Sequence, residues 1–132
     1  MESSLLQNDN QIVKYVSKTA QVGKNVKIWH FAYVGDKTII GDNVMIGSLA
    51  PIDYNVKMGN NTRIEGSVYI PPLTVMGNNV FIAPGATFTN DPYPLSPKLI
   101  GVTVEYGAII AARAVIKSGV TIERIVWLIW VL

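Results

Sequence analysis

Large apolar residues recur at every sixth position along most of the chain. Stepping by six from Val16 to Phe88, all thirteen positions hold Val, Ile, Met or Phe. Four positions after these residues stand Ala, Val or Thr, from Ala20 to Ala86. An α-helix repeats every 3.6 residues and a plain strand every two, so neither element explains this spacing. The pattern therefore predicts a repeat architecture built from one short unit.

The residues between these positions predict tight corners. Gly often follows the large apolar residue, and Asn or Gly often precedes the small one, at positions 25, 43, 55, 61, 79 and 85. Asn and Gly tolerate a positive φ better than other residues, so each unit is expected to be a short strand followed by a corner. Three units would close a coil of eighteen residues with the large apolar side chains inside. Successive coils would stack at the ~4.8 Å spacing of parallel strands.

The six-residue register breaks once. It stops after Phe88 and resumes, shifted, at Val104, and residues 89–103 contain three prolines and no clean hexad. We therefore expect an all-β fold and a single domain over 1–132, with coils at 16–88 and 104–126. A loop inserted at 89–103 would project from one corner.

Composition excludes several classes of site and partner. The chain has no Cys and a single His, His30, so it offers neither thiolate ligands nor the three imidazoles of a γ-class carbonic anhydrase zinc site. We expect no metal. A net charge of +2 without a basic cluster argues against a nucleic-acid partner. The longest apolar run, 125–132, is too short to span a membrane, and the start lacks a signal peptide, so a cytoplasmic location is expected.

Three segments resemble the hexapeptide-repeat transferases. They are Lys-Ile-Trp-His-Phe at 27–31, Arg-Ile-Glu-Gly-Ser-Val-Tyr-Ile-Pro-Pro at 63–72, and Asn-Val-Phe-Ile-Ala-Pro at 79–84 running into Phe-Thr-Asn-Asp-Pro at 88–92. The closer likeness is to nucleotide-sugar 3-amino N-acetyltransferases and the transacetylase domain of bifunctional isomerase–acetyltransferases. The resemblance implies a left-handed parallel β-helix of about five to six coils. It also implies acetyl-CoA as co-substrate and a homotrimer with active sites between subunits.

The chain departs from this family near its C-terminus. Where the family usually reads Gly-Ala-Asn, this chain has Ala111-Ala112-Arg113. The family also continues for one or two more coils, so the C-terminus looks truncated here. The apolar run 125–132 is free of charge and Pro, and we expect it to pair with another chain or cap the last coil.

The resemblance assigns roles to individual residues. Asn90 and Asp91 are the candidate catalytic residues, which would hold and orient the attacking amine, although Asn-Asp-Pro is also a common turn. His30, Glu65 and Tyr69 are candidates for substrate binding, with a subunit contact formed by Trp29, His30 and Phe31 as the stronger interpretation at that corner. The acyl donor would lie along the following residues: Ala83, Ala111, Ala112 and Lys117.

The function expected from these observations is an acetyl-CoA-dependent N-acetyltransferase acting on the amino group of a nucleotide-linked amino sugar. An O-acetyltransferase of the same fold is an alternative, but a hydroxyl nucleophile needs a real base and His30 is badly placed for that role. A truncated solenoid that only oligomerises is a second alternative.

Overall fold

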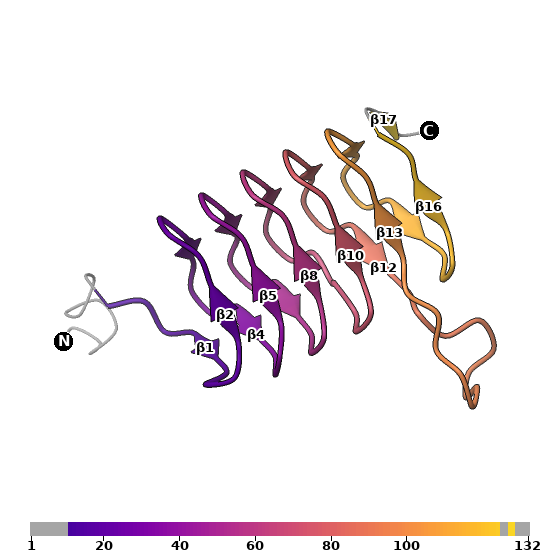
Figure 1. Ribbon diagram of the computed structural model, residues 1–132, viewed down its shortest axis with the longest axis horizontal. Helices are drawn as coiled ribbons and strands as arrows, with labels where there is room; N and C mark the ends of the chain where they lie inside the picture. Colours follow the sequence, from indigo (N-terminus) through magenta and orange to yellow (C-terminus); the bar gives the residue numbers. More distant parts are fainter. Residues whose placement is uncertain (1–10, 125–126, 129–132) are drawn as a thin grey trace, which may run out of the picture.

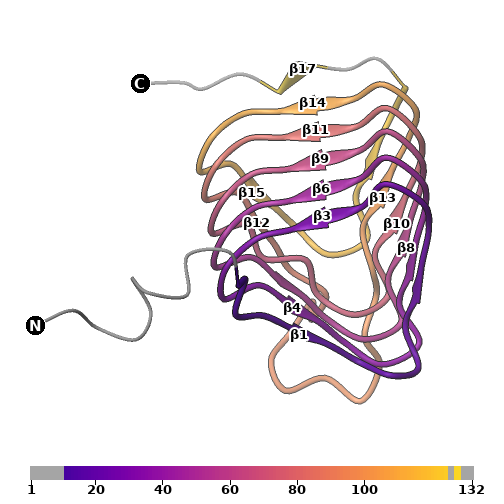
Figure 2. The same cartoon turned by 90° about the vertical axis from the view of Figure 1, so that its left-hand side faces the viewer.

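The computed structural model describes residues 11–124 and, for the backbone alone, 127–128. These residues form seventeen two-residue strands, all paired in parallel, and no helix. The strands stack in successive coils from the N-terminal to the C-terminal end (Figure 1), and each coil has three sides (Figure 2). The all-β parallel solenoid predicted from the six-residue period is therefore confirmed. Among the described residues, nothing forms a helix that is long and apolar enough to cross a bilayer.

The strands make up three faces, each visited once per coil. The first face holds β1 (Tyr15–Val16), β4 (Tyr33–Val34), β7 (Pro51–Ile52), β12 (Thr87–Phe88) and β15 (Val115–Ile116), with single bridges at 69 and 70. The second face holds β2 (Gln21–Val22), β5 (Ile39–Ile40), β8 (Lys57–Met58), β10 (Val75–Met76), β13 (Thr103–Val104) and β16 (Thr121–Ile122). The third face holds β3 (Lys27–Ile28), β6 (Met45–Ile46), β9 (Arg63–Ile64), β11 (Phe81–Ile82), β14 (Ile109–Ile110) and β17 (Trp127–Leu128).

Within β1 to β16 the second residue points inward. Val34, Ile46 and Ile64 are completely buried, and the small residues four positions later, such as Ala50 and Val68, are buried beside them. This alternation follows from the two-residue period of a strand. The first coil is the exception, because Val22 stays 42% exposed at the N-terminal end of the described stack.

Three corners join the faces. In the first coil the first corner spans 17–20, after the first face, the second corner spans 23–26, after the second face, and the third corner spans 29–32, after the third face; each recurs in the later coils. From Asn25 onward, the residue before the small inward residue at a hexad corner adopts a positive φ, as predicted at Asn25, Asn43 and Asn61. The same conformation also occurs in residue types that the sequence did not suggest: Phe31, Lys37, Leu49, Ser67, Leu73 and Arg113. The solenoid path therefore imposes this conformation even where the residue does not favour it.

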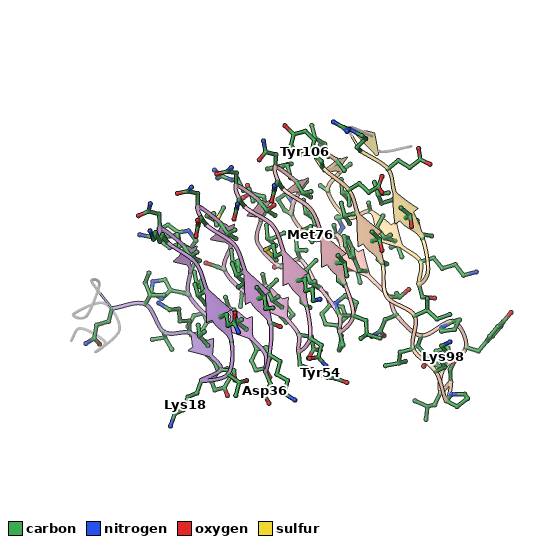
Figure 3. The ribbon with its side chains drawn as sticks, viewed as in Figure 1. Lys18, Asp36, Tyr54, Met76, Lys98 and Tyr106 are labelled. Atoms are coloured by element: carbon green, nitrogen blue, oxygen red, sulfur yellow. The ribbon has the colours of Figure 1, made fainter. Side chains whose placement is uncertain are left out.

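A ten-residue insertion leaves the first corner between β12 and β13. Val75 pairs with Lys57, eighteen residues earlier, but with Thr103, twenty-eight residues later. The resulting loop, residues 89–102, projects beyond the stack (Figure 1). Lys18, Asp36 and Tyr54 line the first corner in consecutive coils, and the loop carrying Lys98 continues that row (Figure 3).

Candidate active site

The predicted site residues form two groups on either side of the first face. His30, Glu65, Ala83, Ala111 and Ala112 all lie on the third corner, after β3, β9, β11 and β14. The second group lies on the first corner and its inserted loop and consists of Asn90, Asp91 and Lys117. Tyr69 lies on the first face between the two groups. The predicted donor-binding set is thus divided, since Lys117 lies on a different corner from the three alanines.

Asn90 fixes the base of the inserted loop. Its Nδ2 donates to the carbonyl oxygen of Pro72, 3.1 Å away, and its own carbonyl accepts from the Ile100 backbone N–H at 2.8 Å. The side-chain Oδ1 makes no hydrogen bond within the described part of the chain. Next to it, the Ser118 N–H donates to Thr89 Oγ1 at 3.0 Å, so the corner that carries Lys117 rests on the loop base.

Asp91 is the centre of a hydrogen-bonded turn. Its carboxylate accepts from the Ser96 hydroxyl and backbone N–H, and from the Tyr93 N–H at 3.1 Å. The Ser96 hydroxyl above all, helped by these backbone donors, lowers the pKa of Asp91 below the usual aspartate value, against a smaller opposing effect of desolvation. Asp91 is therefore a stable anion and a weak proton acceptor.

The Tyr69 hydroxyl is hydrogen-bonded to a carboxylate of the first corner. The hydroxyl oxygen lies 3.2 Å from Asp53 Oδ2. Burial first, and then the Asp53 charge, raise the pKa of Tyr69, so its hydroxyl remains protonated and donates to the carboxylate. Three and two coils earlier on the same face, the rings of Tyr15 and Tyr33 stack with centroids 5.1 Å apart. The first face therefore carries tyrosine hydroxyls and rings between the two sets of predicted site residues.

His30 is at the far end of the third corner, three coils before Ala83. Its Nδ1 accepts from the Val13 backbone N–H at 3.2 Å, which places the proton of the neutral ring on Nε2. The neighbouring Trp29 and Phe31 are 37% and 57% exposed. One chain therefore keeps its only imidazole away from Asn90 and Asp91.

A hollow of about 400 Å³ lies on the third corner across three coils. It is lined by Gly66, Ser67, Pro84, Gly85, Ala112 and Arg113. Ala112 was predicted to bind the donor, whereas Ser67 and Gly85 were not sequence candidates. Arg113 stands out in the sequence because the resembling family has Asn there, and it lies on the wall of this hollow. Glu65 precedes Gly66 of this lining in the sequence. It forms an ion pair with Arg63, whose Nε lies 3.0 Å from Glu65 Oε2.

A second hollow, of about 410 Å³, lies where the second face meets the second corner. Its wall includes Val75, Thr103, Tyr106 and Arg124. The Arg124 guanidinium lies 5.5 Å from the Tyr106 ring centroid, and the Asn79 side chain donates to the Tyr106 hydroxyl at 3.4 Å. None of these residues was a sequence candidate. In the described ranges no three His, Asp or Glu side chains group as metal ligands would.

The comparisons with known proteins agree with the repeat and the fold. The family described as bacterial transferase hexapeptide (six repeats) matches residues 19–50. No curated protein matches the sequence. Among solved structures, a variant of perosamine N-acetyltransferase from Caulobacter crescentus, in complex with CoA and GDP-perosamine, matches 88% of this chain and 50% of its own, with a TM-score of 0.76 and 20% identity.

Two further structures share the solenoid. The acetyltransferase domain of PglB from Neisseria gonorrhoeae is 21% identical with a TM-score of 0.57, over 89% of this chain and 51% of that one. A putative acetyltransferase from Bacillus cereus is 16% identical with a TM-score of 0.55, over 91% and 71%. The chain spans about half the length of the first two structures. At the level of repeat and fold, these matches confirm the resemblance to hexapeptide-repeat acyltransferases, including sugar N-acetyltransferases.

Proposed function

We propose that this chain belongs to an acetyl-CoA-dependent N-acetyltransferase that acts on the amino group of a nucleotide-linked amino sugar. The observation that carries the proposal is the solenoid shared over 88% of the chain with perosamine N-acetyltransferase. A polar loop beginning at Asn90 and Asp91 supports it, because loops on a rigid scaffold commonly carry binding groups.

The chemistry is attack by a neutral amine on the thioester carbonyl. The new C–N bond forms, the C–S bond breaks, and the amine proton passes to the departing thiolate or to water. Asn90 can accept a hydrogen bond from the amine through Oδ1, the oxygen left unpaired by the contact with Pro72. Asp91, whose pKa is lowered by Ser96, orients the amine by its charge and is not the general base.

The donor would occupy the hollow on the third corner beside Ala112, with Ala83 and Ala111 on the same corner. Small side chains there leave room for a thin chain close to the backbone. Lys117 is assigned to the sugar-nucleotide side instead, because its corner rests on the loop base through Ser118 and Thr89. His30, Glu65 and Tyr69 remain candidates for substrate contacts, with Tyr69 nearest to the loop side.

We place the complete active site between subunits of a homotrimer. The third corner and the loop lie on opposite sides of the first face, so one chain does not bring donor and acceptor groups together. Packing the third corner of one subunit near the loop of the next would join them. Exposed apolar residues on that corner, Trp29, Phe31 and Leu49, suit such a contact.

O-acetylation is less consistent with the geometry. A sugar hydroxyl has to be deprotonated during attack, which calls for a base with a pKa near neutrality. His30 Nδ1 accepts a hydrogen bond from the Val13 backbone N–H in the first coil, far from the loop of the same chain. Asp91 is a weaker base than an ordinary aspartate. An amine nucleophile requires neither group as a base.

The direct test is CoA release with dTDP-, UDP- and GDP-linked amino sugars. Asp91→Asn and Asn90→Ala should lower turnover by about 100-fold, the scale of one transition-state hydrogen bond or acid–base group. Asp36→Asn is the matched control, because Asp36 is also a first-corner carboxylate that accepts from a serine hydroxyl, that of Ser17. Full activity in both loop variants would remove the loop from the mechanism, and no release with any amino sugar would overturn the proposed function.

A further inference from the structure

Arg113 occupies a backbone position that suits it poorly. Its φ is 60°, in the left-handed region that favours Gly and Asn. On the second corner the equivalent positions are Asn25, Asn43, Asn61 and Asn79, followed by Gly107. The one backbone hydrogen bond that Arg113 donates, to the Pro84 carbonyl at 2.9 Å, would be made equally by Asn. The folding of the corner therefore gives no reason for an arginine.

The Arg113 side chain lies along the wall of the third-corner hollow. It runs back over Gly85 of the preceding coil, where an added Cβ would lie 3.2 Å from its Cγ and 3.9 Å from its Nη1. Gly85 thus leaves the space that the arginine stem fills. Both residues line the hollow, together with Ser67 and Ala112.

The guanidinium has no acidic partner in the described part of the chain. The one ion pair there joins Arg63 to Glu65, and no residue lining the hollow carries a negative charge. A guanidinium is always ionised and presents parallel N–H donors that match two oxygens of a phosphate. The hollow therefore combines room, exposed backbone and one unneutralised cation.

We propose that Arg113 binds a phosphate group of the acyl donor in this hollow and so helps to determine which thioesters the protein accepts. This inference rests on the proposed function, since it takes a CoA thioester as the donor. It adds a residue that stands where the resembling family has Asn. The solenoid imposes the left-handed φ at this position, so the arginine is retained there for binding, at the expense of local backbone preference.

The test compares Arg113→Asn with Lys37→Asn. Lys37 has the same φ of 60° and the same charge, but it lies on the first corner. Both changes remove one positive charge and place Asn where φ is positive, so both variants should fold and melt at the wild-type temperature or above. Binding is measured by calorimetry with CoA, dephospho-CoA, pantetheine and adenosine 3′,5′-bisphosphate.

Arg113→Asn is expected to weaken CoA binding by about 10- to 100-fold, the range for one charge-assisted hydrogen-bonded contact. Pantetheine binding should be unchanged, and Lys37→Asn should bind every probe as the wild type does. Dephospho-CoA identifies the phosphate: a loss confined to CoA assigns the 3′-phosphate, and an equal loss with both assigns the diphosphate.

Two results would overturn the inference: equal CoA affinity in Arg113→Asn and wild type, or an equal loss in Lys37→Asn. Wild-type protein that binds neither CoA nor the bisphosphate would overturn both this inference and the proposed function. Arg113-dependent CoA binding without acetyl transfer to any amino sugar would support the phosphate contact and contradict the proposed acceptor. The two hypotheses therefore fail separately.

Discussion

From Asn25 onward, the corner residue before each small inward residue of this solenoid is subject to two separate demands. Its backbone must adopt a positive φ, and its side chain must suit the surface or site where it lies. Asn25 and Asn61 satisfy the first with a residue type that favours it. Phe31 and Arg113 adopt the same φ against their preference, and their side chains remain exposed. Corners where the two demands disagree are therefore the places to look for function.

Asp91 shows how far a sequence can identify one side chain's role. Asn-Asp-Pro indicates a turn and a candidate acid, and the structure has the turn. The identity of its main partner, Ser96, could not be predicted, because it depends on the path of a loop with no repeat to constrain it. The lowered pKa follows from that contact rather than from the motif.

Ser96→Ala should raise the pKa of Asp91 toward the ordinary aspartate value, because the largest contribution to its lowering is removed. A folded-state pKa below the unfolded value gives stability that is present above the unfolded pKa and is lost as pH falls through the folded pKa. Ser96→Ala should therefore be less stable than the wild type at neutral pH and should lose less stability on acidification. Carboxyl carbon chemical shifts followed through an acid titration measure the pKa, and urea unfolding at neutral and acid pH measures the stability.

Ser118→Ala is the control for this titration, since Ser118 contacts the loop through its backbone N–H and not its hydroxyl. An unchanged Asp91 titration in Ser96→Ala would contradict the assigned cause.

At the scale of elements, the second corner is held by a ladder of side chains. The Oδ1 atoms of Asp42, Asn60 and Asn78 each accept from the backbone N–H eighteen residues earlier, at 2.7–2.8 Å. The ladder needs glycine at the position beside it: a Cβ on Gly23, Gly41 or Gly59 would lie 2.3–2.4 Å from one of these oxygens.

The sequence predicted the strands and the corner Gly and Asn positions, because six-residue spacing encodes them. It did not predict the ladder, which joins residues of different coils.

Gly59→Ala should destabilise the protein by about 3 kcal/mol, the upper part of the range for overpacking. Its new methyl group would lie 2.4 Å from Asn78 Oδ1 and 2.5 Å from the Gly77 carbonyl carbon, so the ladder or the backbone must shift. Gly66→Ala is the comparison, because its Cβ would meet only the Ser48 oxygen, at 3.3 Å. That change should cost less than about 1 kcal/mol. Urea unfolding of both variants measures the difference, and equal losses would contradict the ladder's role.

At the scale of the whole molecule, the solenoid determines which distant residues share an edge. Residues eighteen apart stack, so His30, Glu65 and Ala83 fall on one corner although His30 and Ala83 are three coils apart. The ten-residue insertion then shifts every later position, so that Ala111 joins that corner whereas Lys117 does not. The predicted donor-binding set therefore combines residues of two corners, and its role stays a prediction. The predicted pairing role of 125–132 concerns residues that, apart from the backbone of 127–128, lie outside the described part.

The proposed subunit contact can be tested with residues that already have a positive φ. Phe31 and Leu49, 57% and 59% exposed, lie on the third corner with φ of 61° and 63°. Asn suits this conformation better, so Phe31→Asn with Leu49→Asn should fold at least as well as the wild type while losing the apolar contact.

Leu73→Asn is the matched control, because Leu73 is 42% exposed with φ of 73° but lies on the first corner. If the third corner forms the trimer, the double variant should sediment as a monomer at micromolar concentration, whereas wild type and Leu73→Asn should sediment as trimers. The double variant should also lose acetyl transfer, because donor and loop groups would no longer meet. A trimeric double variant would move the contact to another surface. A monomer that still transfers acetyl groups would show that one chain completes the site, which the placement of the two groups on either side of the first face argues against.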